Sequence, residues 1–239
     1  MTNSSITDVA AGSQAHLAKA VHPALERRVN VLDNLITEAG RAMHVLSRSA
    51  LATRPNPAGR NTGDADASLD TDEIQHAAGL MRVNHVGEIC AQALYRGQAL
   101  FCKDQQVQEL LYHAATEEVD HLVWCDDRLK ELGSKPSVFN PLWYAASFGL
   151  GVVASRAGTP YNLGFMAETE RQVEEHLDAH LKDLPQQDLR SRKIVVQMRD
   201  DEIGHRTTAE DNGATALPAP VKLAMKLMSK VMTTSAYRV

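Results

Sequence analysis

The 239-residue chain has few cysteines, few aromatic residues and no excess of basic residues. Its three cysteines (Cys90, Cys102 and Cys125) show no C-x-x-C spacing and cannot all pair, which argues against a structural zinc site or a disulfide framework and favours a reducing compartment. The formal net charge of −5 argues against a nucleic-acid-binding protein, for which a clustered basic excess is expected. The N-terminus lacks a basic stretch followed by an apolar run, so we expect no signal peptide.

The chain also lacks an uninterrupted apolar run of about twenty residues, the length that a transmembrane helix needs. Segment 136–155 contains no charged residue, but proline, glycine and several hydroxyl groups interrupt it. We therefore expect this segment to lie in a membrane interface or beneath other helices. Near the C-terminus, Lys222, Lys226 and Lys230 recur every four residues, which fits either a capping helix with a solvated lysine face or an interfacial membrane helix.

No segment alternates apolar and polar residues as a half-buried strand does, so an all-α chain is predicted. Apolar periodicity predicts four long helices at about residues 71–102, 104–132, 162–184 and 188–211. A shorter amphipathic helix is predicted between Val29 and Leu46, after about 24 residues that we expect to be poorly ordered. Segment 52–70 is rich in Pro, Gly, Asn and Asp and predicts a linker. Residues 1–70 are thus expected to form an N-terminal extension and residues 71–239 the main helical domain.

Two of the predicted helices carry a Glu-x-x-His motif inside an apolar stripe, formed by Glu118 with His121 and by Glu202 with His205. Residues three apart share one face of a helix, so each pair can bind a single ion. A buried carboxylate without a partner costs several kcal/mol, which makes its presence in a core stripe hard to explain without a ligand. One such motif occurs often by chance, but two copies in two core stripes indicate a metal site.

Each motif is matched by a lone glutamate on the preceding helix. Glu88 lies 30 residues before Glu118, and Glu170 lies 32 residues before Glu202. The midpoints fall near residues 103 and 186, where composition predicts turns, so two antiparallel hairpins bring each lone glutamate level with its motif. The result is a four-helix bundle with one long apolar crossover, and its centre holds four carboxylates and two imidazoles.

This donor set is the one found in ferritin-like di-metal proteins. Two divalent ions neutralise four carboxylates, so a cluster that is costly when empty becomes neutral when occupied. Mixed carboxylate and imidazole ligands favour iron or manganese.

Other titratable residues leave alternatives open. Glu174 is a rival to Glu170, but Glu170 continues the apolar stripe and is preferred. Glu117 and Asp201 directly precede the two motifs; they fit either acceptors for the free ring N–H of a histidine across the bundle or solvated helix acids.

Three histidines and a tyrosine lie near the stripes. His85 fits a neighbour of the site or a satisfied core histidine, and Tyr95 is expected to serve packing. His176 and His180 are expected on the polar face, with His176 a possible proton carrier.

The chain closely resembles the demethoxyubiquinone hydroxylase family of ubiquinone biosynthesis, bacterial type, in the stretches MRVNHVGEICAQALYRGQA, TEEVDHL, NPLWYAASFGLG, ETERQVEEHL, MRDDEIGH and VMTTSAYRV. The resemblance implies a ferritin-like di-iron monooxygenase. Such an enzyme uses O2 to hydroxylate the ring of 2-polyprenyl-3-methyl-6-methoxy-1,4-benzoquinol. It implies two Fe ions per chain, bound by Glu88, Glu118, His121, Glu170, Glu202 and His205.

The resemblance also implies peripheral association with the cytoplasmic face of the bacterial inner membrane, where a polyprenyl tail can leave the bilayer. The chain is also expected to form a homo-oligomer or to bind a lipid-binding protein of the kind that eukaryotic members use. Three alternative functions share the same ligands: a ferritin-class ferroxidase or peroxidase, a di-iron oxygenase of another lipid, and a membrane-associated helical scaffold with a structural metal.

Overall fold

The computed structural model describes residues 31–61 and 68–239, and in this part of the chain every regular element is a helix. The elements are α1 (Val31–Leu46), α2 (Thr71–Leu100), α3 (Gln105–Glu131), α4 (Asn140–Ala154), the short 3-10 helix η1 (Ser155–Ala157), α5 (Thr159–Asp183), α6 (Leu189–Asp211) and α7 (Ala219–Ala236). The first 24 residues, expected to be poorly ordered, lie outside the described residues. So does the predicted beginning of the N-terminal helix at Val29.

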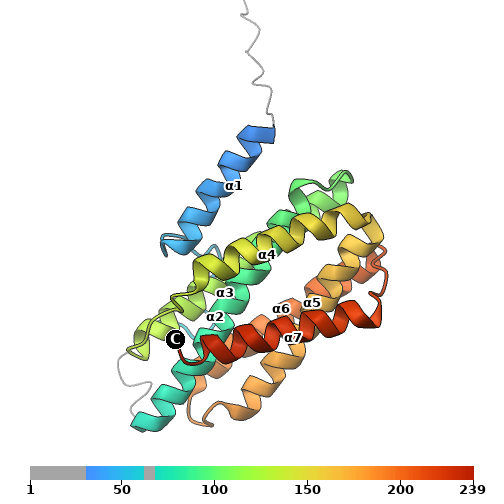
Figure 1. Cartoon of the computed structure of the whole chain (residues 1–239). Coiled ribbons are helices and arrows are strands. Elements are labelled where there is room, and N and C mark those ends of the chain that lie inside the picture. Colours follow the sequence, from blue (N-terminus) through green and yellow to red (C-terminus); the bar gives the residue numbers. More distant parts are fainter. Residues whose placement is uncertain (1–30, 62–67) are drawn as a thin grey trace, which may run out of the picture.

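The four long helices form two antiparallel hairpins, α2–α3 and α5–α6, which pack side by side as a bundle (Figure 1). The hairpins turn at residues 101–104 and 184–188, where composition predicts turns. Asp104 and Asp188 cap the second helix of each pair, because their side chains accept hydrogen bonds from backbone N–H groups three residues further on. The predicted all-α four-helix bundle is confirmed.

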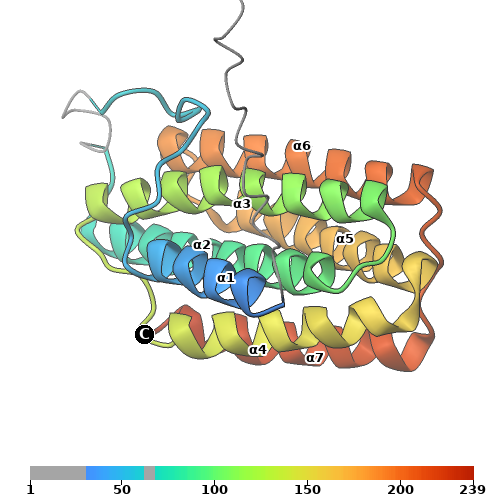
Figure 2. The same ribbon diagram turned by 90° about the horizontal axis from the view of Figure 1, so that it is seen from above.

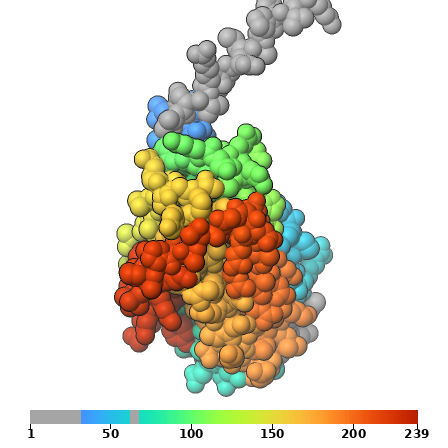
Figure 3. Space-filling view, turned by 90° about the vertical axis from the view of Figure 1, so that its right-hand side faces the viewer, coloured from blue at the N-terminus to red at the C-terminus, as the bar shows by residue number. Residues whose placement is uncertain are grey.

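The helices are arranged in three layers (Figure 2). One layer contains α3 and α6, the middle layer contains α2 and α5, and the third contains α4 and α7. Figure 3 shows α7 in red at the surface, lying across α5. Because helices cover α2 from several directions, it is buried along most of its length, from Ala77 to Leu100. A carboxylate in this stretch, such as that of Glu88, therefore lies deep inside the protein.

The crossover between the two hairpins contains a complete helix, α4, where the sequence indicated only an apolar segment. This helix packs against α2 at two glycines. A Cβ atom at Gly151 would lie 2.1 Å from the carbonyl oxygen of Leu94, and one at Gly97 would lie 2.2 Å from that of Phe148. The two backbones thus approach so closely that only glycine fits.

We expect Gly151→Ala to destabilise the protein by about 1–3 kcal/mol, because the added methyl group has to push α4 away from α2. The melting temperature followed by circular dichroism should then fall by about 2–12 °C. Gly149→Ala on the same helix is the matched control, since its Cβ meets no atom within 4 Å. It should be neutral or stabilising, because alanine favours helix by about 1 kcal/mol. Equal melting temperatures of the two variants would contradict the close packing.

The outer face of α4 and α7 carries large apolar side chains that are exposed to solvent, among them Leu142, Val153, Leu223, Leu227, Met228 and Val231. Within the described residues, none of the helices combines the length and the hydropathy needed to cross a bilayer.

Candidate metal centre

The structure brings the six residues of the predicted ligand set together at the centre of the bundle, where all of them are buried. Their donor atoms fall into two groups, each within 4.8 Å: Glu88, Glu118, His121 and Glu202 in one, and Glu118, Glu170, Glu202 and His205 in the other. Glu118 and Glu202 belong to both groups. The side chains come from α2, α3, α5 and α6, so the two hairpins are both needed to form the cluster.

The two shared carboxylates each direct one oxygen toward each histidine. His121 Nδ1 lies 3.0 Å from Glu118 Oε2 and 3.4 Å from Glu202 Oε1. His205 Nδ1 lies 3.3 Å from Glu118 Oε1 and 3.2 Å from Glu202 Oε2. The arrangement could hold two ions, one at each group of donor atoms, with the carboxylates of Glu118 and Glu202 offered to both.

The remaining two carboxylates lie at opposite ends of the cluster. Glu88 Oε2 is 3.6 Å from His121 Nδ1, and Glu170 Oε1 is 3.5 Å from His205 Nδ1. Each position is thus offered one imidazole, one carboxylate of its own and a share of the two bridging carboxylates.

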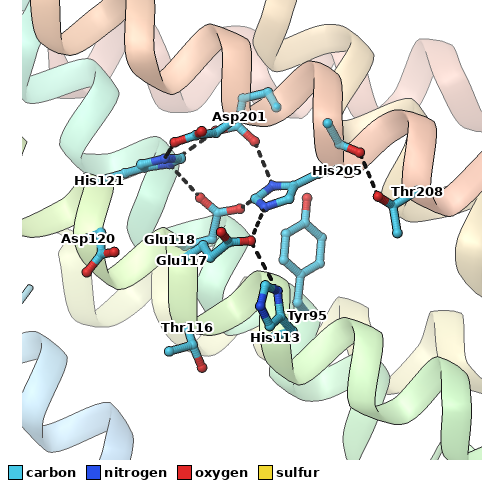
Figure 4. Close-up of polar contacts among 12 residues, drawn as sticks. Tyr95, His113, Thr116, Glu117, Glu118, Asp120, His121, Asp201, His205 and Thr208 are labelled. Atoms are coloured by element: carbon cyan, nitrogen blue, oxygen red, sulfur yellow. Dashed lines mark hydrogen bonds and ion pairs between the residues drawn. The ribbon is translucent and has the colours of Figure 1, made fainter. Parts of the chain in front are cut away.

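Each histidine is also held from outside the cluster, across the bundle. His121 Nε2 lies 2.8 Å from Asp201 Oδ2, and His205 Nε2 lies 2.9 Å from Glu117 Oε2 (Figure 4). These contacts favour the interpretation of Glu117 and Asp201 as acceptors for the ring N–H groups over that of solvated helix acids. A carboxylate can only accept, so the proton of a neutral imidazole belongs on Nε2 and the lone pair of Nδ1 faces the cluster.

The carboxyl groups in the cluster do not ionise independently. Burial raises the pKa of Glu88 and that of Glu170 well above the usual value of a glutamic acid, because the charged form loses its hydration. Burial acts in the same direction on Glu118, but hydrogen bonds with His121 and His205 outweigh it and lower its pKa. Without a cation, protons are therefore needed to neutralise part of this cluster.

The donor set fits a pair of metal ions. Glu170 Oε2 is buried and has no hydrogen-bond partner among the described residues, and the buried Glu118 Oε1 has only the ring nitrogen of His205 beside it, 3.3 Å away. Such an oxygen normally costs free energy, whereas coordination to a cation would satisfy it. The donors are oxygen and imidazole nitrogen, which suits iron or manganese.

Tyr95 on α2 contacts the cluster, although the sequence suggested only a packing role. Its hydroxyl group donates a hydrogen bond of 2.5 Å to Glu170 Oε1. Tyr95 lies seven residues after Glu88 on the same helical stripe, and this spacing was the signal that could have identified it.

Glu174, the rival of Glu170, does not reach the cluster; it forms an ion pair with Arg206. His85 is buried, and its ring lies 3.5 Å from the amide nitrogen of Asn140, as expected of a core histidine. Burial lowers the pKa of His85 to about 4.

The expectation that His180 lies on the polar face is wrong, because its side chain is buried beside His176, with a ring separation of 3.9 Å. Burial lowers the pKa of His180 to about 3 and that of His176 to about 4. His176 itself is half-buried and lines a cavity.

This cavity lies between α2, α4, α5 and α7, and its wall includes Glu88 of the cluster. The other walls are mainly apolar, with Ala91, Leu94, Trp143, Phe165, Met225 and Met232 among them. Its volume is about 170 Å³, and an apolar cavity of about 150 Å³ is large enough for a benzene molecule. The cavity is therefore large enough for an aromatic ring, and Glu88 forms part of its wall.

Comparison with known proteins agrees with this geometry. Residues 75–236 match the family model of the ubiquinone biosynthesis protein COQ7. A protein of Bordetella avium is 65% identical over 212 residues, which cover 89% of this chain and 97% of that protein. One of Bordetella parapertussis is 62% identical over 214 residues (90% and 96%), and one of Ralstonia pickettii is 54% identical over 217 residues (87% and 100%). All three are named 3-demethoxyubiquinol 3-hydroxylase. From its sequence over most of its length and from its helical bundle, this chain belongs to the COQ7 family of ubiquinone biosynthesis proteins.

Proposed function

We propose that the chain is a di-iron monooxygenase that hydroxylates the ring of a polyprenyl 3-demethoxyubiquinol, the reaction that its relatives' names state. The observation that carries the proposal is the position of Glu88, which belongs to the metal-binding cluster and to the wall of the apolar cavity. A ferroxidase has the same ligands but needs no cavity for an aromatic ring. The cavity therefore favours hydroxylation of an organic substrate.

In this proposal two iron ions would be held by Glu88, Glu118, His121, Glu170, Glu202 and His205. When bound, a pair of ferrous ions supplies electrons for the activation of O2. One oxygen atom enters a ring C–H bond as a hydroxyl group, and the other leaves as water. The balance requires two electrons and two protons in all; the two ferrous ions, when bound, would supply the electrons of one turnover, and an external donor would have to restore them before the next.

The residues of the chain bind the substrate and hold the ligands in place. The apolar cavity walls take the quinol ring and exclude water from its reacting carbon. Tyr95 fixes one oxygen of Glu170, while Asp201 and Glu117 fix the two imidazole rings. We assign this catalytic work to residues 71–239, with residues 1–70 as an extension.

The polyprenyl tail would leave the cavity through the layer formed by α4 and α7. Met228 lines the cavity and is also 54% exposed, so the cavity reaches the protein surface at α7. The surrounding exposed apolar side chains, with Lys222, Lys226 and Lys230 on the same helix, suit the interface of a membrane with anionic lipids. We propose peripheral association with the cytoplasmic face of the inner membrane. A homo-oligomer stays a prediction, and so does a lipid-binding partner protein of the kind that the family resemblance implies.

The test is reconstitution of the metal-free chain with Fe(II) under anaerobic conditions, followed by metal analysis and a single turnover with 18O2 and a short-chain demethoxyquinol. We expect about two irons per chain and a ring that has gained one labelled oxygen atom. Oxidation of iron with an untouched quinol would instead favour a ferroxidase or another substrate. Absence of stoichiometric metal would contradict the ligand set.

A further inference from the structure

The segment that follows α1 crosses the bundle and contacts the surroundings of the metal centre. Residues 52–60, which we call the strap, run from α1 over α3 toward α6 (Figure 2). At its far end, Arg190 of α6 donates hydrogen bonds to the carbonyl oxygens of Ala58 and Gly59. Ala52 and Ala58 pack against the apolar core. The strap precedes residue 75, where the family match begins, so the family model does not describe it.

Arg54 is the residue of the strap that reaches the centre. Its Nε lies 2.8 Å from Asp120 Oδ2, and its Nη1 lies 2.9 Å from Asp201 Oδ2. The guanidinium group also stacks over the ring of Trp124, 5.0 Å from the centroid. The backbone N–H of Thr53 donates to Asp120 at 2.6 Å. One guanidinium group thus joins a buried carboxylate of α3 to the carboxylate of α6 that holds His121.

Asp201 Oδ2 receives two contacts, one from Arg54 and one from the ring of His121. The guanidinium group donates only, so it cannot replace the aspartate as an acceptor for the imidazole N–H. Arg54 Nη2 also lies 3.3 Å from His121 Nε2, but both atoms carry hydrogen when the proton of the neutral ring is on Nε2, so this contact does not hold the ring. The arginine instead fixes the position of the carboxylate, and the carboxylate fixes the ring. A planar fork bound to two carboxylates does this better than a flexible ammonium group.

The other half of the centre has no such arginine within the described residues. Glu117, the acceptor for His205, pairs instead with His113, whose side chain is 76% exposed. The side chain of His205 is 10% exposed, whereas that of His121 is 0% exposed. The two ion positions, similar in their ligands, therefore differ in what surrounds them.

We propose that Arg54 is a positioning residue of the metal centre. It acts through Asp201 on His121, so that the strap strengthens ion binding at the His121 position but not at the His205 position. The inference rests on the proposed role of His121 as a ligand. A carboxylate that orients a ligating histidine typically contributes 10–100-fold in metal affinity. Removing the arginine that positions this carboxylate should lower the affinity for one of the two ions by up to this factor.

The test is anaerobic calorimetric titration of the metal-free, full-length chain with Fe(II), together with Mössbauer spectra of the 57Fe-loaded protein. For Arg54→Gln we expect one equivalent to bind as in the wild type and the other to bind more weakly, by a factor of up to about 10–100. One of the two ferrous signals should change. His113→Gln, which removes the exposed partner of Glu117, is the matched control and should leave both equivalents unchanged.

Arg54→Lys separates geometry from charge, because lysine keeps the positive charge opposite Asp120 and Asp201 but lacks the planar fork. We expect it to resemble Arg54→Gln, and it carries the same test should the glutamine variant not fold. Adding Arg54→Gln to Asp201→Asn should cause little further loss if the arginine acts through the aspartate.

Two results would overturn the inference in distinguishable ways. Wild-type affinities and spectra in both folded Arg54 variants would exclude a positioning role while leaving the ligand set intact. A wild-type chain that binds no iron would contradict the ligand set itself and this inference with it.

Discussion

Glu118→Ala is expected to lower quinol hydroxylation at least about a thousandfold and to reduce the iron content from two ions to at most one per chain. Glu118 directs one oxygen to each half of the centre, so its loss affects both ion positions at once. Catalysis by a bound metal is worth several kcal/mol, and each 1.4 kcal/mol of activation free energy is about tenfold in rate. Metal analysis and a single-turnover assay with O2 and a short-chain demethoxyquinol measure the two effects.

Glu174→Ala is the matched control for this variant. Glu174 is another glutamate of the bundle, but it pairs with Arg206 and does not reach the cluster. Two irons per chain and near wild-type turnover are expected for it. Folding of the Glu118 variant is checked by circular dichroism, because removing the buried partner of His121 and His205 is expected to cost stability. A folded Glu118→Ala protein with two irons and full activity would rule out the bridging role.

Loading the metal-free protein with two Fe(II) ions should raise its melting temperature by about 15 °C. An ion present at about 1,000 times its dissociation constant adds about 4 kcal/mol to the free energy of unfolding, so two ions add about 8 kcal/mol. The entropy of unfolding is about 2.1 cal/mol/K per residue, which for 239 residues is about 0.5 kcal/mol/K. Anaerobic thermal unfolding with and without iron at fixed pH measures the shift.

A chelator added to the loaded protein should return the melting temperature to that of the metal-free form. The control is Glu118→Ala, in which at most half of the shift is expected because one or both ions are lost. A melting temperature that does not respond to Fe(II) would show that the cluster of carboxylates gains nothing from a cation. The ligand assignment would then have to be abandoned.

The centre could be predicted from the sequence because its geometry depends on spacing within hairpins. The distances along the chain from Glu88 to Glu118 and from Glu170 to Glu202 determine which residues are level, and helical periodicity determines which face they share. Both patterns are local or nearly so. The six residues that the pattern selected are the six that the structure brings together.

Contacts between distant segments could not be predicted in this way. The close approach of α4 to α2 depends on Gly97 facing Phe148 and Gly151 facing Leu94, and a single glycine in a sequence does not reveal its partner. Arg54 meets Asp120 across 66 positions, and the Pro- and Gly-rich composition of its segment indicated only a linker. Helical periodicity predicts His180 on the polar face. Its side chain is buried because of the packing between helices, which periodicity does not describe.

Two hollows reach the six-residue cluster from different layers of the bundle. On the side of α4 and α7, the approach to Glu88 is apolar, and it suits a substrate whose tail stays in lipid. On the side of α3 and α6, a second hollow lined by Glu117, Asp201 and His205 is more polar, and it suits water and protons. In the proposed reaction the quinol would enter from one side while the water formed from O2 leaves on the other. The paths of the quinol and of the water would not cross, so the lipid-soluble substrate could react without passing through the aqueous phase.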